Sequence, residues 1–199
     1  MEFSVGRTGI RIQPVFAALL TLMLIADTSG VCALSLVACI VHESGHLLCL
    51  LALGGHAEKV TLSFYGMKIE RKNELCVSHR GELAVALAGP AVNLALAVPI
   101  LAVAQNFYAP LRVAGLCQLC VGLFNLLPVV PLDCGRAVFI AVSMKKGEQT
   151  AVHVTRILSA VTLLPLAAAS FAVFFCGNFN ITLLLVTGYI AFLYISDKK

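Results

Sequence analysis

Charged residues are scarce in this sequence of 199 residues: they make up 12% of it, whereas hydrophobic residues make up 60%. A typical soluble domain is about 45–50% apolar and about 25% charged, so the composition excludes that class. The mean hydropathy of +0.96 agrees with an integral membrane protein. Long polar blocks are also lacking. We therefore expect one compact membrane domain over residues 1–199.

Apolar runs separated by turn and polar segments predict an all-α polytopic membrane protein with about six transmembrane helices. Residues 1–11 read as a short polar head. The run that follows is expected to stay as a span, because no polar mature domain comes after it. The six predicted spans are residues 12–26, 31–53, 81–104, 111–127, 151–175 and 181–195. A short helix is expected at residues 137–144.

The longest polar stretch, residues 56–80, separates spans two and three. Within it, residues 60–70 alternate apolar and polar side chains around Gly66, which predicts a small β-hairpin. An exposed strand edge there would capture an extended substrate segment through main-chain hydrogen bonds. A plain connector is the equally open alternative.

Cysteine patterns of the metal-binding or redox kind are lacking, although the sequence has eight cysteines. Most of them lie in or beside apolar runs, where a thiol usually serves as a small hydrophobic side chain. The pair Cys117-x-x-Cys120 has neither a second CxxC nor a nearby histidine. A metal or redox role for these cysteines is therefore not favoured.

Residues 42–46 form an HExxH motif inside the second predicted span. His42 and His46 are four residues apart, so on a helix they share one face and can reach a single Zn²⁺. Glu43 can then act as general base toward a water molecule at the metal. Three such side chains are costly in a span and point to function. The alternative is a pair of core histidines with ordinary hydrogen bonds.

Two histidines leave a catalytic zinc one protein ligand short, and acidic residues at membrane depth are nearly absent. Glu82 opens span three, where a solvated carboxylate is the ordinary explanation. Asp133 follows the helix-breaking prolines at the end of span four, and a turn aspartate is its alternative reading. The remaining histidines lie in polar or interfacial stretches: His56, His79 and His153.

Basic residues predict the orientation. With the N-terminus inside, the predicted inner segments hold nearly all Lys and Arg residues, and the outer turns hold only Arg112. We therefore expect both termini in the cytoplasm. His42, His46 and Asp133 then lie toward the cytoplasmic face, at similar depth.

Three segments together resemble the site-2 protease family of intramembrane metalloproteases. They are the motif His42-Glu43-Ser44-Gly45-His46, the segment Ala88-Gly89-Pro90-Ala91-Val92-Asn93, and the segment Asn125-Leu126-Leu127-Pro128 leading to Leu132-Asp133-Cys134-Gly135-Arg136. The resemblance covers about residues 31–140. It is strongest to the compact bacterial branch related to the sporulation protease called stage IV FB.

This resemblance implies a zinc ion held by His42, His46 and Asp133, with Glu43 as catalytic base. It also implies that Asn125 lies near the site and helps to position the scissile carbonyl. Cys134 stands where many relatives have the first glycine of LDGGR, which leaves Asp133 intact but places a thiol beside the metal. No regulatory domain of the cystathionine-β-synthase or PDZ type is expected.

The predicted function is an intramembrane zinc metalloprotease of the cell membrane, which cleaves membrane proteins in or near their transmembrane segments. Membrane-bound regulatory or inhibitory partners and an oligomer are compatible with it, and nucleic acid is not expected as a partner. A metal-ion transporter would explain the histidines and the aspartate, but gives Glu43 no role. A non-catalytic membrane scaffold is the third possibility, and the intact motif argues against it.

Overall fold

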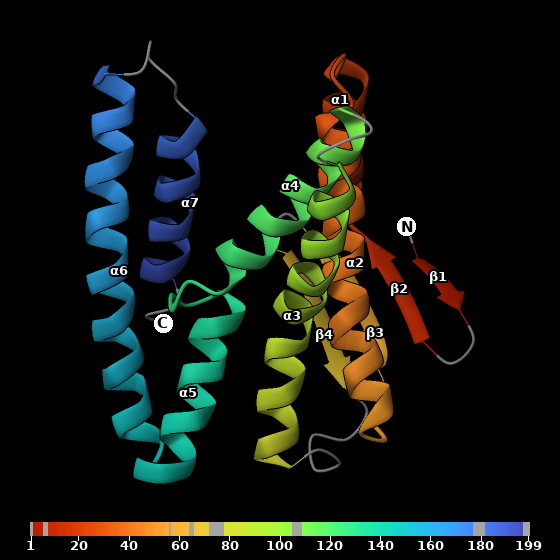
Figure 1. Cartoon of the computed structure of the whole chain (residues 1–199). Coiled ribbons are helices and arrows are strands. Elements are labelled where there is room, and N and C mark those ends of the chain that lie inside the picture. The colour runs from red at the N-terminus through yellow and green to blue at the C-terminus, as the bar shows by residue number, and fades with distance from the viewer. Residues whose placement is uncertain are drawn as a thin grey trace. The chain divides into compact units, whose positions relative to one another are not determined.

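The computed structural model describes residues 2–5, 8–55, 57–63, 66–71, 78–104, 109–176 and 182–196. In this described part the chain forms seven helices and four strands (Figure 1). It divides into two compact units, Met1–Leu123 and Phe124–Lys199. The predicted single metalloprotease domain stays a prediction.

The first unit contains a four-stranded sheet with the order β1-β2-β3-β4 (Figure 1). Its strands are β1 Glu2–Val5, β2 Thr8–Ile12, β3 Ala57–Ser63 and β4 Gly66–Arg71. β3 and β4 pair antiparallel where the sequence predicts a hairpin, and β2 pairs parallel with β3. β1 and β2 replace the predicted polar head. Each strand is so short that the alternation of apolar and polar residues along it is a weak indication of β-structure.

The first unit also contains four helices. Helices α1 Pro14–Ala26 and α2 Val31–Ala52 lie between β2 and β3 in the chain, and α3 His79–Ala104 and α4 Ala109–Asn125 follow β4; the last two residues of α4 lie beyond the unit boundary. Pro14 opens α1, a position that tolerates its missing N–H. The Asp27 carboxylate accepts hydrogen bonds from the N–H groups of Ser29 and Cys32, at 3.0 and 2.7 Å, and so holds the start of α2.

Helices α2 and α3 lie side by side (Figure 1) and approach closely at Gly45. A Cβ atom added to Gly45 would lie 2.9 Å from the carbonyl oxygen of Ala88 and 3.2 Å from the Cα of Gly89. Small residues permit such backbone contact between membrane helices. The close approach sets the HExxH segment of α2 against the backbone of α3.

The second unit consists of α5 Asp133–Lys146, α6 Glu148–Cys176 and α7 Thr182–Ser196. Its core centres on Val129, Leu163 and Ile190. Helix α5 begins four residues before the predicted short helix. Gly135 explains this early start, because the carbonyl oxygen of Val129 folds to 2.5 Å from the place of a Gly135 Cβ and only glycine leaves that room.

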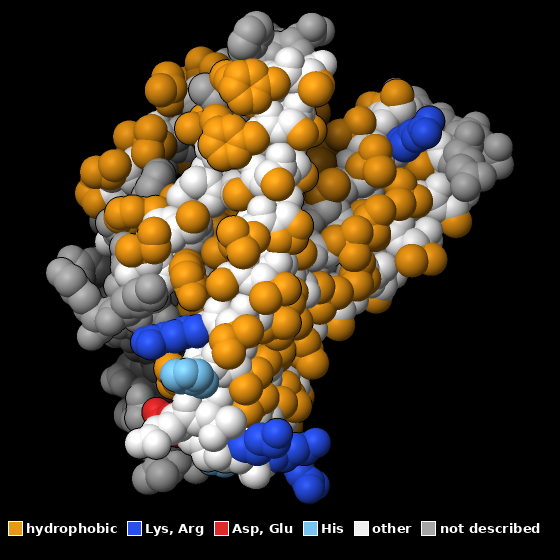
Figure 2. Space-filling view, turned by 90° about the vertical axis from the view of Figure 1, so that its left-hand side faces the viewer, with side chains coloured by type: hydrophobic (Ala, Val, Ile, Leu, Met, Phe, Trp, Pro, Cys, Tyr) orange, Lys and Arg blue, Asp and Glu red, His pale blue; other side chains and the backbone are white. Residues whose placement is uncertain are grey.

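Helices α2, α3 and α6 are long and apolar enough to cross a membrane; the shorter apolar helices are Pro14–Ala26, Ala109–Asn125 and Leu183–Ile195. On α6 five exposed large apolar side chains are three, four or seven residues apart, which places them on one face, as in a lipid-facing stripe: Ile157, Val161, Leu164, Phe171 and Phe175. Figure 2 shows this side covered by hydrophobic side chains. The chain is therefore a multi-pass membrane protein, and the predicted number of six spans stays a prediction.

Candidate metal centre

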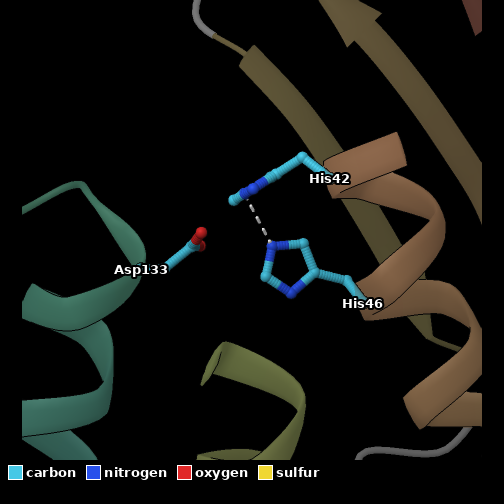
Figure 3. A group of neighbouring side chains, drawn as sticks. All are labelled: His42, His46 and Asp133. Atoms are coloured by element: carbon cyan, nitrogen blue, oxygen red, sulfur yellow. Dashed lines mark hydrogen bonds between the residues drawn. The ribbon is translucent and has the colours of Figure 1, made fainter. Parts of the chain in front are cut away.

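The HExxH motif lies in the second half of α2, and its two imidazoles point toward each other (Figure 3). His42 is 5% exposed and His46 is 8% exposed. Their rings meet edge to face with centroids 4.8 Å apart, and the two Nε2 atoms are 3.1 Å apart. The helical spacing thus aims the same atom of both rings at one point.

The proton of the His46 ring is held on Nδ1. This atom lies 2.7 Å from the carbonyl oxygen of Val85 on α3. A backbone carbonyl only accepts hydrogen bonds, so Nδ1 must be the donor. In the neutral ring the Nε2 atom that faces His42 then carries a lone pair, as a metal ligand requires.

A buried amide makes the same assignment for His42. Its Nδ1 lies 2.8 Å from Oδ1 of Asn93, which is fully buried on α3. The Asn93 Nδ2 group donates to the carbonyl oxygen of Ala38 at 3.1 Å and to Oε1 of Gln118 at 2.6 Å. The Ala38 carbonyl only accepts, so it fixes which end of the amide is Nδ2. Oδ1 then accepts from His42, whose Nε2 also carries a lone pair.

The Nε2 atoms are 3.1 Å apart, so a shared proton or a metal ion would relieve the repulsion between their lone pairs. Two nitrogen ligands at 2.0–2.1 Å from one tetrahedral Zn²⁺ stand roughly 3.3 Å apart. The oxygen acceptors behind both rings are the partners that metal-bound histidines usually have. The pair therefore fits a zinc ion in separation, tautomer and outer hydrogen bonds.

Gly89 provides the space beside the two rings. A Cβ atom added there would lie 2.6 Å from Cε1 of His46 and 2.9 Å from Cε1 of His42. Carbon atoms do not approach this closely without a shift of the neighbour. Any side chain at this position would displace the imidazoles, so the site depends on a glycine of α3.

Glu43 follows His42 directly on α2 and is half-buried. Asp133 is the first residue of α5 and is also half-buried, and Asn125 is the last residue of α4. The described side chains that could together hold a metal ion are His42 and His46 of the first unit and Asp133 of the second (Figure 3).

The other residues considered from the sequence are not members of this group. Glu82 lies in the first turn of α3, Cys134 follows Asp133 in α5, and the His153 side chain is exposed on α6. His79 begins α3. His56 lies outside the described residues.

The sequence prediction did not assign the residues that hold the histidines: Val85, Gly89, Asn93 and Gln118. Two of them carry a signal that was available, since an amide side chain within an apolar run needs a buried partner. Gly89 and the carbonyl of Val85 act through backbone geometry. Only the packing of α2 on α3 reveals that role.

Comparisons with known proteins place this geometry in context. The family model described as Peptidase family M50 matches residues 102–169. A putative zinc metalloprotease of Synechocystis is 35% identical over 124 residues, which are 59% of this chain and 32% of the relative. A zinc metalloprotease of Methanocaldococcus jannaschii is 29% identical over 167 residues, which are 78% of this chain and 45% of the relative.

The chain spans less than half the length of these two curated relatives. Its fold matches a solved structure of the site-2 protease from Methanocaldococcus jannaschii with a TM-score of 0.70. The sequences are 24% identical, and the match covers 100% of this chain and 95% of the other. The chain is thus similar to Peptidase family M50 over residues 102–169, to two zinc metalloproteases over part of their length, and in its fold to a site-2 protease.

Proposed function

We propose that this chain is an intramembrane zinc metalloprotease that cleaves peptide bonds in or near transmembrane segments of membrane proteins. One observation carries the proposal. The Nε2 atoms of His42 and His46 face each other at 3.1 Å with their Nδ1 protons held by oxygen acceptors, and Glu43 adjoins them on α2. The names of the two relatives point to the same chemistry.

His42, His46 and Asp133 would hold the ion. A zinc ion in such a site polarises a carbonyl and lowers the pKa of a water molecule to about 7. Ligation by Asp133 would join the two units of the chain, since the histidines belong to the first and Asp133 to the second. The chemistry of its carboxylate supports this role, because Asp and Glu oxygens are usual ligands of catalytic zinc beside histidine.

The protein side chains would move the protons and orient the substrate. Glu43 would take a proton from the attacking water and return it to the leaving amine, as a general base and then a general acid. The amide of Asn125 would donate a hydrogen bond to the scissile carbonyl. Val85 and Asn93 would keep both histidine rings from turning.

The substrate would bind as an extended strand beside β4. A transmembrane helix keeps its carbonyls in internal hydrogen bonds, so it must unwind before hydrolysis. β4 is the last strand in the order of the sheet. Its outer edge would receive the unwound segment through main-chain hydrogen bonds.

The proposed setting is the cell membrane, with six spans, both termini in the cytoplasm and the active site toward the cytoplasmic face. The distribution of Lys and Arg supports this orientation. We also propose the stage IV FB-like branch of the family, which makes a sporulation role and membrane-bound regulatory partners part of the hypothesis. A reporter fused to each terminus would test the orientation.

The substitution Glu43→Gln tests the function. It removes the base while it keeps the shape of the side chain. We expect the purified variant to keep its zinc and to lose cleavage of a membrane substrate by at least about a hundredfold, the usual contribution of a positioned general base. Glu148→Gln is the matched control, because Glu148 is an exposed glutamate at the start of α6. Undiminished cleavage by Glu43→Gln would overturn the proposal.

The substitution Asp133→Ala tests the third ligand. We expect a lower zinc stoichiometry after dialysis against a chelator, with Glu148→Gln again as control. A full complement of tightly held zinc would exclude Asp133 from the site. Zinc uptake into vesicles by the wild type, without cleavage of any membrane substrate, would favour a transporter instead.

A further inference from the structure

A pocket of about 410 Å³ lies in the second unit, between α5 and α6. Apolar side chains form most of its wall, and they are Val130, Pro131, Phe139 and Val152. Arg136 of α5 and Arg156 of α6 add two guanidinium groups. A cavity of this size with apolar walls and a few polar groups is typical of a site for an amphiphilic small molecule.

The charge of the pocket is of one sign. Its lining includes both arginines and no carboxylate. Within the described part of the chain, no ion pair joins either guanidinium to an acidic side chain. Arginine presents several donors in a planar fork that matches the oxygens of a phosphate or carboxylate. The pocket is therefore complementary to an anion with an apolar portion.

The position of Arg156 along α6 identifies the source of that anion. After Arg156 the helix continues through nineteen uncharged residues, 157–175, before Cys176. At 1.5 Å per residue this run is about 28 Å long, close to the thickness of about 30 Å of the hydrocarbon core. Arg156 thus lies at the boundary where phospholipid headgroups are found. In Figure 2 most of the Lys, Arg and His side chains of this face lie in its lower part, and a further Lys or Arg lies at the upper right.

One wall of the pocket is anchored to α6. The backbone N–H of Val130 donates a hydrogen bond of 3.1 Å to the hydroxyl of Ser159, which is fully buried. The hydroxyl of the neighbouring Thr155 donates to the carbonyl oxygen of Ala151 at 2.7 Å within the helix. These polar groups already bond within the protein. Arg136 and Arg156 are the charged side chains of the lining.

We propose that this pocket binds an anionic phospholipid, with the phosphate between Arg136 and Arg156 and the first acyl carbons on Phe139 and Val152. The lipid site does not depend on the proposed protease activity. No acidic or aromatic cage for a quaternary ammonium lines the pocket. The site would therefore prefer phosphatidylglycerol to phosphatidylcholine.

The test uses the full-length protein in detergent micelles and a fluorescent phosphatidylglycerol. Binding is measured alone and in competition with unlabelled phosphatidylglycerol, phosphatidylcholine and inorganic phosphate. We expect Arg156→Gln to weaken the binding of phosphatidylglycerol about tenfold, in the range of one charge-assisted contact. Arg112→Gln is the matched control, because it removes an equal charge from the exposed surface of α4, outside the pocket.

A second variant keeps both arginines and fills the pocket with a larger side chain. Val152→Trp should also weaken binding while it leaves both arginines in place. If Arg156→Gln and Arg112→Gln weakened phosphatidylglycerol binding equally, the lipid would be attracted by the overall positive charge of the protein, and the proposed site would be wrong. Displacement of the lipid by inorganic phosphate as effectively as by phosphatidylglycerol would overturn the lipid as occupant. Unchanged binding in both pocket variants would place the lipid elsewhere.

Discussion

The Nδ1 atom of His42 lies 2.8 Å from Oδ1 of Asn93, so a buried amide of α3 decides which nitrogen of a histidine on α2 faces the metal site. The same amide is held in its orientation by the carbonyl of Ala38 and by Gln118. Residues of α2, α3 and α4 together determine which nitrogen of the His42 ring carries the proton. The aligned Nε2 atom is a consequence of all three contacts.

The substitution Asn93→Leu should lower zinc affinity about 10–100-fold, the usual effect of removing the acceptor behind a metal-bound histidine. Competition with a chromophoric chelator measures this change. Asn93→Asp keeps an oxygen acceptor for Nδ1 and should retain more zinc than Asn93→Leu. Equal affinities in the two variants would show that the acceptor does not orient His42.

The substitution Gly89→Ala should displace the histidine rings, because the new Cβ would lie 2.6 Å from Cε1 of His46. We expect the variant to hold a minor fraction of the zinc of the wild type, measured by elemental analysis after gel filtration. Gly188→Ala on α7 is the matched control, since a Cβ there meets no atom within 4 Å. Full zinc content in Gly89→Ala would contradict the close approach of α3 to the rings.

The substitution Ser159→Ala leaves the partly buried N–H of Val130 without its acceptor. The free energy of unfolding should fall by about 1–3 kcal/mol, measured by denaturant titration in detergent. Ser170→Ala is the control on the same helix. The Ser170 hydroxyl only donates to the carbonyl of Ala167, three residues before it, so its loss should cost much less. Equal effects of the two substitutions would rule out a special role for Ser159.

Asp27 makes stability depend on pH at the turn between α1 and α2. The Ser29 hydroxyl, helped by the N–H groups of Cys32, Ser29 and Gly30, holds the pKa of Asp27 below its ordinary value of 3.8. The ionised carboxylate is therefore favoured in the folded state. Its contribution is complete above pH 3.8 and disappears as the pH falls through the lower pKa of the folded protein.

The measurement compares the melting temperatures of wild type and Asp27→Asn across this pH range, in a chelator so that metal loss plays no part. The wild type should melt higher near neutral pH, and the difference should shrink as the solution becomes more acidic. A difference that is constant with pH would show that the carboxylate does not act through its charge.

The long helices could be predicted from the sequence because uninterrupted apolar runs set both their existence and their ends. α2 and α3 begin and end within two residues of the predicted spans. The start of α5 at Asp133 could not be predicted, since it depends on the fold of the Val129 carbonyl over Gly135. From the local sequence alone, Pro128 and Pro131 predict an irregular segment.

The candidate site also has a part that could be predicted from the sequence and a part that could not. His42, Glu43 and His46 are encoded by spacing on one helix, which a sequence displays directly. The contact of His42 with Asn93 joins residues 51 positions apart, and that of Asn93 with Gln118 joins residues 25 apart. Such pairs depend on how the helices pack, and a single sequence contains no record of that packing.

The parallel pairing of β2 with β3 restricts how often the chain between these two strands can cross the membrane. Because these strands are hydrogen-bonded neighbours, the chain leaves the sheet at Ile12 and returns to it at Ala57 on one side of the bilayer. The chain between them must then cross an even number of times. α2, with 22 residues, is about 33 Å long and suffices for one crossing.

If α2 makes one crossing, the other must be made by α1, which comes before it and whose 13 residues measure about 20 Å, well short of the hydrocarbon core of about 30 Å. A short helix is accommodated by thinner bilayer or by flanking residues that reach outward. In a six-span arrangement the strand pairing therefore imposes a hydrophobic mismatch at α1. Lipids beside α1 should be compressed relative to those beside α6, whichever face of the membrane carries the sheet.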